Sequence, residues 1–82
     1  MTVIFTDHAR SQLRERKLSK IFVLASIKKP SLIKKQADGR FKFIKSFKQG
    51  GRTFLLICVV EKTSDSIIIV TVFKTSKIKK YL

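Results

Sequence analysis

The single histidine of this sequence and its many lysines and arginines have the clearest capacity for chemistry. His8 stands beside 19 Lys or Arg, 5 Asp or Glu and one cysteine in a chain of 82 residues. Histidine ionises near neutral pH, so it can act as either an acid or a base. A lone histidine excludes two-histidine catalysis, and the few scattered acids give neither a paired-carboxylate site nor a metal-ligand cluster. We therefore expect no metal and no cofactor.

The net charge indicates the kind of partner. Its formal value is +14, whereas a magnitude of about 2–8 is usual for a small soluble domain. Charge of one sign destabilises a compact domain through self-repulsion unless a polyanion or an acidic partner offsets it. Nucleic acid is the first expected partner, an acidic protein the second, and an anionic membrane surface the least favoured. A merely soluble basic surface is the remaining alternative.

Length and composition predict one folded domain, residues 1–82. Hydrophobic residues make up 44% of the chain, with only 3 Gly and 1 Pro, which excludes a disordered segment. Cys58 cannot form an internal disulfide and lies in the apolar run from Phe54 to Val60, as expected of a buried thiol. That run is far shorter than the roughly 20 residues of a membrane-spanning helix, and no signal-peptide pattern opens the chain. We expect a cytoplasmic protein with no membrane partner.

The elements that must position these side chains begin with a short strand over residues 2–5 and two helices over about residues 7–17 and 20–29. Thr6 and Ser19 are the N-cap candidates of the two helices, and a proline ends the second one. The second helix is expected to have a broad apolar side. Its members are Ile21, Val23, Leu24, Ala25 and Ile27.

The first helix combines a thin apolar stripe with a functional candidate row. Ala9 and Leu13 form the stripe. His8, Gln12 and Arg16 follow one another at i, i+4 and i+8, so they lie in one row that borders the stripe. This row can face whatever the helix packs on.

From residue 31 onward the hydrophobic period becomes two, which predicts antiparallel strands. The expected strands cover residues 31–37, 40–48, 52–61 and 67–74. Asp38-Gly39 is expected as a type I′ turn, Gly50-Gly51 as a second turn, and residues 75–82 as a short helix or an edge strand. The fold class is therefore α+β: a strand, a helical hairpin and an antiparallel meander of about four strands, with the helices on one sheet face. The opposite face needs a cover, from the tail and from a partner protein.

The strand over residues 40–48 is expected to be half-buried with a basic outer face. Its apolar face carries three phenylalanines, which we interpret as core: Phe41, Phe43 and Phe47. Its basic face carries Arg40, Lys42 and Lys48. Lys45 falls on the phenylalanine side and breaks the alternation, so a bulge or a strand end is expected near it.

Two segments are similar to motifs of a known group. Residues Phe5 to Arg16 read FTDHARSQLRER and resemble F-T-x-H-A-x-x-R-M-x-x-R, the opening of a small uncharacterised family akin to the BrnT toxins. Residues Val70 to Tyr81 read VTVFKTSKIKKY and resemble that family's ending, V-x-T-V-Y-R-T-S-K-x-K-K-Y. With the small size, the charge and the order of elements, the chain resembles the RelE/ParE-like toxin superfamily of toxin–antitoxin modules.

The resemblance implies a growth-inhibiting toxin held inactive by a cognate antitoxin, which we expect to be acidic. RelE-like members cut mRNA on the ribosome, whereas ParE-like members poison DNA gyrase. Our first hypothesis is the toxin of a type II module that acts as a metal-independent ribonuclease on RNA, in the first place mRNA, free or on the ribosome. The alternatives are a DNA gyrase inhibitor, or a degenerate, noncatalytic toxin fold that binds nucleic acid and regulates its own operon.

Metal-free RNA cleavage requires fixed cations, because attack of the 2′-hydroxyl on phosphorus builds negative charge on the phosphoryl and leaving oxygens. The candidate catalytic residues are His8, Arg16, Lys42, Arg52, Lys74 and Tyr81. His8 is the candidate acid or base, Arg16 can hold a phosphate, and Arg52 and Lys74 can clamp the scissile phosphate. Tyr81, which rests on the resemblance of the ending, can stack on a base or donate a proton. The candidate nucleic-acid-binding residues are Arg40, Lys42, Lys48, Lys77, Lys79 and Lys80.

Structural alternatives accompany these roles. His8 can serve as a capping or packing residue, Arg16 can pair with Glu15 or Glu61, and Tyr81 can cover the sheet.

Three positions depart from the family pattern. Gln12 stands where the family usually has Arg, Lys17 where it favours Gly, and Lys74 where it favours Arg. If the first or the last Arg is catalytic in relatives, this chain is slower, altered in substrate or inactive.

Overall fold

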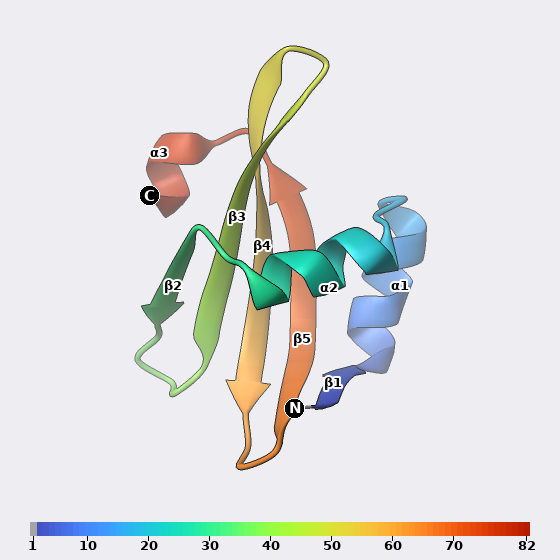
Figure 1. Cartoon of the computed structure of the whole chain (residues 1–82), viewed down its shortest axis with the longest axis vertical. Helices are drawn as coiled ribbons and strands as arrows, with labels where there is room; N and C mark the ends of the chain where they lie inside the picture. Colours follow the sequence, from blue (N-terminus) through green and yellow to red (C-terminus); the bar gives the residue numbers. More distant parts are fainter. Residues whose placement is uncertain (1) are drawn as a thin grey trace.

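One mixed sheet of five strands organises the molecule, which is described by a computed structural model over residues 2–82 (Figure 1). The elements are β1 (Thr2–Phe5), α1 (Asp7–Glu15), α2 (Lys20–Lys28), β2 (Leu32–Lys35), β3 (Phe41–Gln49), β4 (Arg52–Lys62), β5 (Ser66–Thr75) and α3 (Ile78–Tyr81). The strand order across the sheet is β1-β5-β4-β3-β2. The α+β class and the antiparallel series from β2 to β5 are as expected from the sequence. The two helices do not lie side by side as the expected hairpin would, because α1 packs on β5 whereas α2 crosses β3 and β4 (Figure 1).

The first strand forms an edge of the sheet through a pairing that the sequence does not predict. β1 pairs in parallel with β5, from Thr2 opposite Ser66 to Phe5 opposite Ile69. All other neighbouring strands are antiparallel. The sheet is therefore an antiparallel meander with one parallel edge strand.

The two predicted N-caps are confirmed. The Thr6 hydroxyl accepts a hydrogen bond from the backbone N–H of Ala9 at 3.1 Å, and the Ser19 hydroxyl accepts one from Phe22 at 3.2 Å. Each satisfies a backbone donor that the first helical turn leaves free. Each cap thereby fixes where its helix begins.

The apolar stripe of α1 is confirmed, whereas that of α2 is narrower than expected. Ala9 and Leu13 are buried, as is Val23 of α2. Ile21, however, is 81% exposed and Ala25 is also exposed. Residues two apart on a helix point in nearly opposite directions, so Ile21 cannot share the buried face of Val23.

Both glycine turns form, but the type I′ geometry belongs to only one of them. Asp38 does not have a positive φ, and the backbone N–H of Gly39 donates to Gln36 in a type I turn, after which Gly39 adopts φ 89°. This is the three-residue hairpin loop with a left-handed glycine, so the expected type I′ turn at Asp38-Gly39 is wrong. The two-residue type I′ turn is Gly50-Gly51, with φ 59° and 78°.

Neither the bulge nor the strand end expected near Lys45 is found there, because β3 runs on to Gln49. The β3–β4 register is continuous through Lys45, and the irregularity lies between Val59 and Val60 in the β4–β5 pairing. Lys45 fits the helix-covered side because its ammonium donates to the carbonyl of Lys29 at 2.9 Å. Lys29 is the C-cap of α2, and a cation on its carbonyl complements the negative end of the helix dipole.

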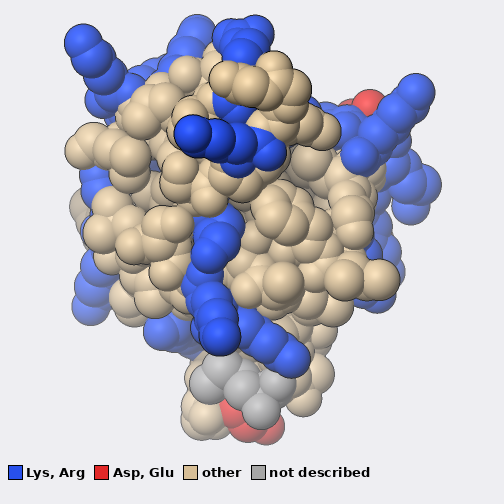
Figure 2. Space-filling view, turned by 45° about the horizontal axis from the view of Figure 1, so that its top comes forward, with Lys and Arg blue, Asp and Glu red and all other residues tan. Residues whose placement is uncertain are grey.

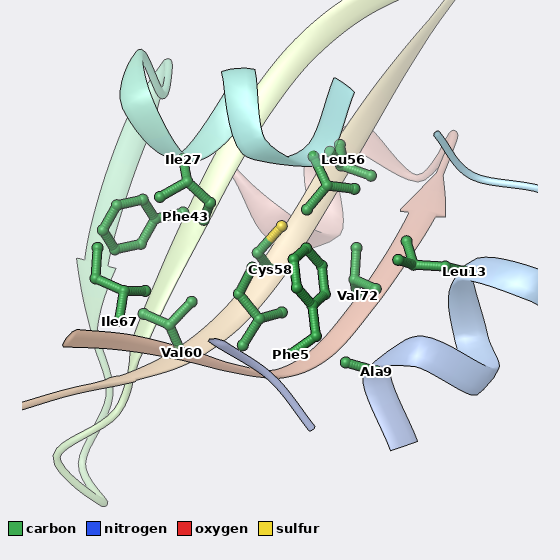
Figure 3. Close-up of a cluster of buried hydrophobic side chains, with 12 residues drawn as sticks. Phe5, Ala9, Leu13, Ile27, Phe43, Leu56, Cys58, Val60, Ile67 and Val72 are labelled. Carbon is green, nitrogen blue, oxygen red and sulfur yellow. The ribbon is translucent and has the colours of Figure 1, made fainter. Parts of the chain in front are cut away.

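The main core lies between the helices and the sheet. Figure 3 shows Phe5, Leu56 and Cys58 packed beneath α2, with Ala9 and Leu13 reaching in from α1. The three side chains under α2 are 0–6% exposed. We call this side of the sheet the helix face.

The opposite side of the sheet, which we call the α3 face, has a smaller core. Ile44, Leu55 and Ile57 are fully buried there, and Ile78 and Tyr81 of the C-terminal segment pack against them. The tail thus supplies part of the cover expected from the sequence, as a short helix. Across residues 2–82, no helix has the length and apolar character to cross a membrane.

Candidate nucleic-acid interface

A concavity at one end of the helix face gathers several cations around aromatic rings. It has a volume of about 310 Å³ and lies between the α1–α2 turn and the adjoining ends of β3 and β5. Its lining residues are Lys17, Leu18, Ser19, Phe22, Phe47, Lys48, Gln49 and Lys74. We call it the lysine–phenylalanine pocket. No acidic residue is among those that line it.

Lys17 enters the pocket from the end of α1. The N–H of Lys17 donates to the carbonyl of Arg14, and the N–H of Leu18 to that of Leu13, which is the Schellman pattern of a helix end. Lys17 has φ 52°, in the left-handed region that favours glycine. This geometry explains why the resembled family favours glycine here, and it shows that this chain places a cation at a strained position.

Three aromatic rings run beneath the cations. Phe22 of α2 meets Phe47 of β3 edge to face, with ring centroids 5.0 Å apart. Phe47 stacks on Phe54 of β4 at 5.8 Å. Phe47 belongs to the stripe that the sequence assigns to core, yet it is only half-buried and lines the pocket.

Lys74 and Arg52 share one aromatic support. The Lys74 ammonium lies 4.8 Å from the Phe54 ring centroid and donates to Oε1 of Gln49 at 2.9 Å. The Arg52 guanidinium lies 5.5 Å from the same ring. The structure thus brings together the two residues predicted to clamp a phosphate, at the β4 start and the β5 end.

Lys42 and Tyr81 form a separate group on the α3 face. The Lys42 ammonium lies 5.6 Å from the Tyr81 ring centroid, and that of Lys80 lies 5.5 Å from it. Lys34 donates to the Tyr81 carbonyl at 3.1 Å, and Phe73 meets the ring at 5.7 Å. Tyr81 therefore covers the sheet, and the sheet separates this group from the pocket.

His8 and Arg16 are exposed and lie at opposite ends of α1, about 12 Å apart along the axis. Gln12, between them in the predicted row, is buried at 8% exposure. Arg16 makes no ion pair with Glu15 or Glu61 among the described residues. Neither His8 nor Arg16 lines the lysine–phenylalanine pocket.

The remaining binding candidates differ in whether a carboxylate pairs with them and in where they lie. The Arg40 guanidinium pairs with Glu61 at 2.8 Å, which offsets its charge. Lys48 lines the pocket, whereas Lys77 precedes α3 and Lys79 and Lys80 are exposed on it.

Little acidic charge balances these cations. Within residues 2–82, ion pairs form only between Arg10 and Asp7 and between Arg40 and Glu61. In Figure 2, Lys and Arg side chains surround the visible face and cross its middle, while acidic atoms show at two small places. The surface therefore keeps a strong positive potential.

Thiol chemistry is disfavoured. Burial raises the pKa of the Cys58 thiol from its ordinary value of 9.0 to about 12. The thiolate, which is the reactive form, is therefore scarce at neutral pH. In the part of the chain that the structure describes, no three His, Cys, Asp or Glu side chains gather as a metal site.

Sequence reasoning missed Lys17, Phe22 and Gln49 as site residues. The signal for Lys17 was present, because a non-glycine residue at a helix C′ position is unusual. Phe22 and Gln49 carry no comparable local signal, since only the packing of α2 against the β3 end brings them together.

The fold and the pocket define a small basic α+β protein with a cationic, aromatic-lined pocket. Residues 5–74 match the family described as a domain of unknown function, DUF4258, and the chain belongs to this family. The matched region contains every residue that lines the pocket and ends before α3. No curated protein and no solved structure matches the chain.

Proposed function

We propose that this protein is a toxin-type, metal-independent ribonuclease that binds RNA, in the first place mRNA, at the lysine–phenylalanine pocket. The pocket is the observation that carries the proposal, because it combines three lysines with two phenylalanines and has no acidic lining residue. Cations bind phosphates, and aromatic rings stack with bases. The resemblance of both end motifs to the BrnT-like and RelE/ParE-like toxins supports the toxin assignment.

In the proposed reaction, Lys74 and Arg52 stabilise the negative charge that develops on the scissile phosphate. Lys74 is held by Gln49 and by the Phe54 ring, and Arg52 is held by the same ring. Their positions are set before RNA arrives, so little reorganisation is needed as negative charge builds. We expect both residues to bind phosphoryl oxygens.

One observation favours a second candidate, a noncatalytic nucleic-acid-binding toxin. His8 and Tyr81, the candidates for proton transfer, both lie outside the pocket. A well-placed acid or base contributes roughly 10²–10⁴-fold to such a reaction. Binding without cleavage, including inhibition of DNA gyrase or repression of the operon, needs no such group.

The charge supports a further partner, an acidic antitoxin, and the expected location is the cytoplasm. Most of the described lysines and arginines have no carboxylate at salt-bridge distance. An acidic protein that covers them would offset the self-repulsion and would compete with RNA.

Incubation of the purified protein with a defined mRNA in the presence of a chelator tests the proposal. We expect fragments with 2′,3′-cyclic ends, a large loss of cleavage in Lys74→Gln, and normal cleavage in Lys62→Gln, a surface lysine outside the pocket. His8→Ala shows whether His8 transfers a proton, since removal of an exposed side chain is expected to change stability little.

Two other outcomes are informative. RNA that is bound but never cut supports the noncatalytic candidate, and a change in DNA supercoiling with intact mRNA in expressing cells identifies gyrase as the target. Absence of any RNA binding overturns the proposal.

A further inference from the structure

We infer that the lysine–phenylalanine pocket receives one unstacked nucleobase of single-stranded RNA, while its lysines bind the neighbouring phosphates. The inference rests on the proposed function and names the substrate class. It concerns how the pocket recognises RNA, and it holds whether or not the bound RNA is then cleaved.

The size of the pocket supports a single base. Its volume of about 310 Å³ is at the lower end of the roughly 300–1,000 Å³ of small-molecule sites. Such a concavity accepts a unit the size of one nucleoside. A duplex keeps its bases stacked inside and presents a convex backbone, so it cannot fill the pocket.

The aromatic wall is fixed before the ligand arrives. The Phe47 ring contacts those of Phe22 and Phe54, with centroids 5.0 Å and 5.8 Å away, and both contacts restrict its motion. Phe22 and Phe47 are half-buried and both line the pocket. A preorganised ring loses little entropy when a base packs on it.

The charges surround this wall. Lys17, Lys48 and Lys74 are exposed, whereas the two phenylalanines lie deeper. Cations at the rim with apolar rings below match a nucleotide, whose phosphate stays in solvent while its base is withdrawn from it. An acidic peptide supplies negative charge. It can pack on the aromatic wall only where an apolar side chain lies next to its acidic residue.

Gln49 adds a polar edge. Its Oε1 accepts the hydrogen bond from Lys74, so its amide group remains as a donor. A donor beside the aromatic wall suits the acceptor atoms that every base carries on its edge. A hydrogen bond from this donor would fix the orientation of the base on the aromatic wall.

Fluorescence anisotropy with three noncleavable 2′-O-methyl RNA probes tests the inference on the unmodified protein. The probes are a single strand, the same strand with abasic positions, and a duplex. Because base–aromatic stacking contributes about 1–3 kcal/mol per base, we expect the abasic strand to bind about tenfold or more weakly. The duplex should also bind more weakly than the single strand, despite its higher charge density.

A matched pair of variants locates the effect. Phe47→Leu should weaken binding of the intact strand and leave that of the abasic strand unchanged, whereas Phe41→Leu, half-buried near the other end of β3, should alter neither. Loss of binding to both strands in Phe47→Leu would indicate a folding defect, and the probe comparison on the unmodified protein then decides.

The two levels of the proposal fail differently. Equal affinity for all three probes overturns the base pocket but preserves RNA binding by charge. Binding to none of them overturns the proposed function as well. Occupation of the pocket by a peptide rich in Asp, Glu and Phe, with no RNA binding, would overturn both in favour of a protein partner.

Discussion

The side-chain oxygen Oε1 of Gln12 accepts a hydrogen bond of 2.9 Å from the backbone N–H of Val72. β5 continues past the end of β1, whose pairing stops at Phe5 opposite Ile69, so the N–H of Val72 has no strand partner on that side. Gln12 supplies the missing acceptor. Arginine, which the resembled family usually has at this position, carries no acceptor atom. The departure at position 12 is thus part of how this chain holds α1 on the sheet.

Loss of this hydrogen bond should destabilise the fold. Gln12→Ala leaves a buried backbone donor unpaired, so we expect the free energy of unfolding to fall by about 1–3 kcal/mol. Urea denaturation followed by circular dichroism measures the change. Gln36→Ala is the control, because the Gln36 side chain makes no hydrogen bond within residues 2–82. Its free energy of unfolding should stay within about 0.5 kcal/mol of that of the unmodified protein. An equal effect of both variants would contradict the role of Gln12.

Lys17 should show opposite effects on stability and binding. Lys17→Gly removes the strain of a left-handed lysine, so the free energy of unfolding should rise by about 0.5–1 kcal/mol. RNA affinity should fall, because a pocket cation is lost. Lys17→Asn separates the two contributions, since asparagine tolerates the same backbone conformation without the charge. Thermal unfolding and anisotropy on the same samples test both, and unchanged RNA affinity in either variant would remove Lys17 from the interface.

The salt dependence of RNA affinity should show how many pocket cations contact phosphates. For single strands, the slope of log K against log salt concentration is about −0.7 for each phosphate neutralised. We expect Lys74→Gln to make the slope shallower by about 0.7 and Lys62→Gln to leave it nearly unchanged. Anisotropy titrations at several salt concentrations give the slopes, and identical slopes for the two variants would argue that the charge acts without a defined site.

Cys58 should report on global unfolding. Its neutral thiol is the form that the fold favours, since burial raises the pKa to about 12 from 9.0. Below pH 9 the thiol is neutral in both states and stability is unaffected. As pH rises from 9 towards 12, the unfolded state gains thiolate and stability is lost. We expect a thiol reagent to react slowly with the folded protein and rapidly in urea. Fast reaction at neutral pH without denaturant would show that the site opens locally.

Local signals predicted most of the fold. Thr6 and Ser19 begin their helices as hydroxyl caps do in general, and the Gly50-Gly51 turn follows from the need for positive φ. Asp38-Gly39 misled the prediction, because the same dipeptide suits a three-residue loop. The parallel pairing of β1 with β5 could not be predicted from periodicity, since it depends on residues more than 60 positions apart.

The site was predictable only in pieces. Arg52 and Lys74 could be placed together, because antiparallel neighbours bring the start of one strand beside the end of the next. Their shared contact with the Phe54 ring requires that both side chains lie on the same face of the sheet, which strand order alone does not give. Lys42 and Tyr81 were grouped with them by chemistry alone, and the sheet places this pair on its other side.

The adjacency of β1 and β5 has a consequence for how the protein is made. On the ribosome, β1 has no strand neighbour until β5 has been synthesised, and Lys74 is among the last residues of β5. Contacts so distant in sequence form late and slowly. The sheet edge and the lysine–phenylalanine pocket are therefore completed only after β5 has been synthesised. If the proposed target is correct, a nascent chain that still lacks β5 is inert towards the message that encodes it.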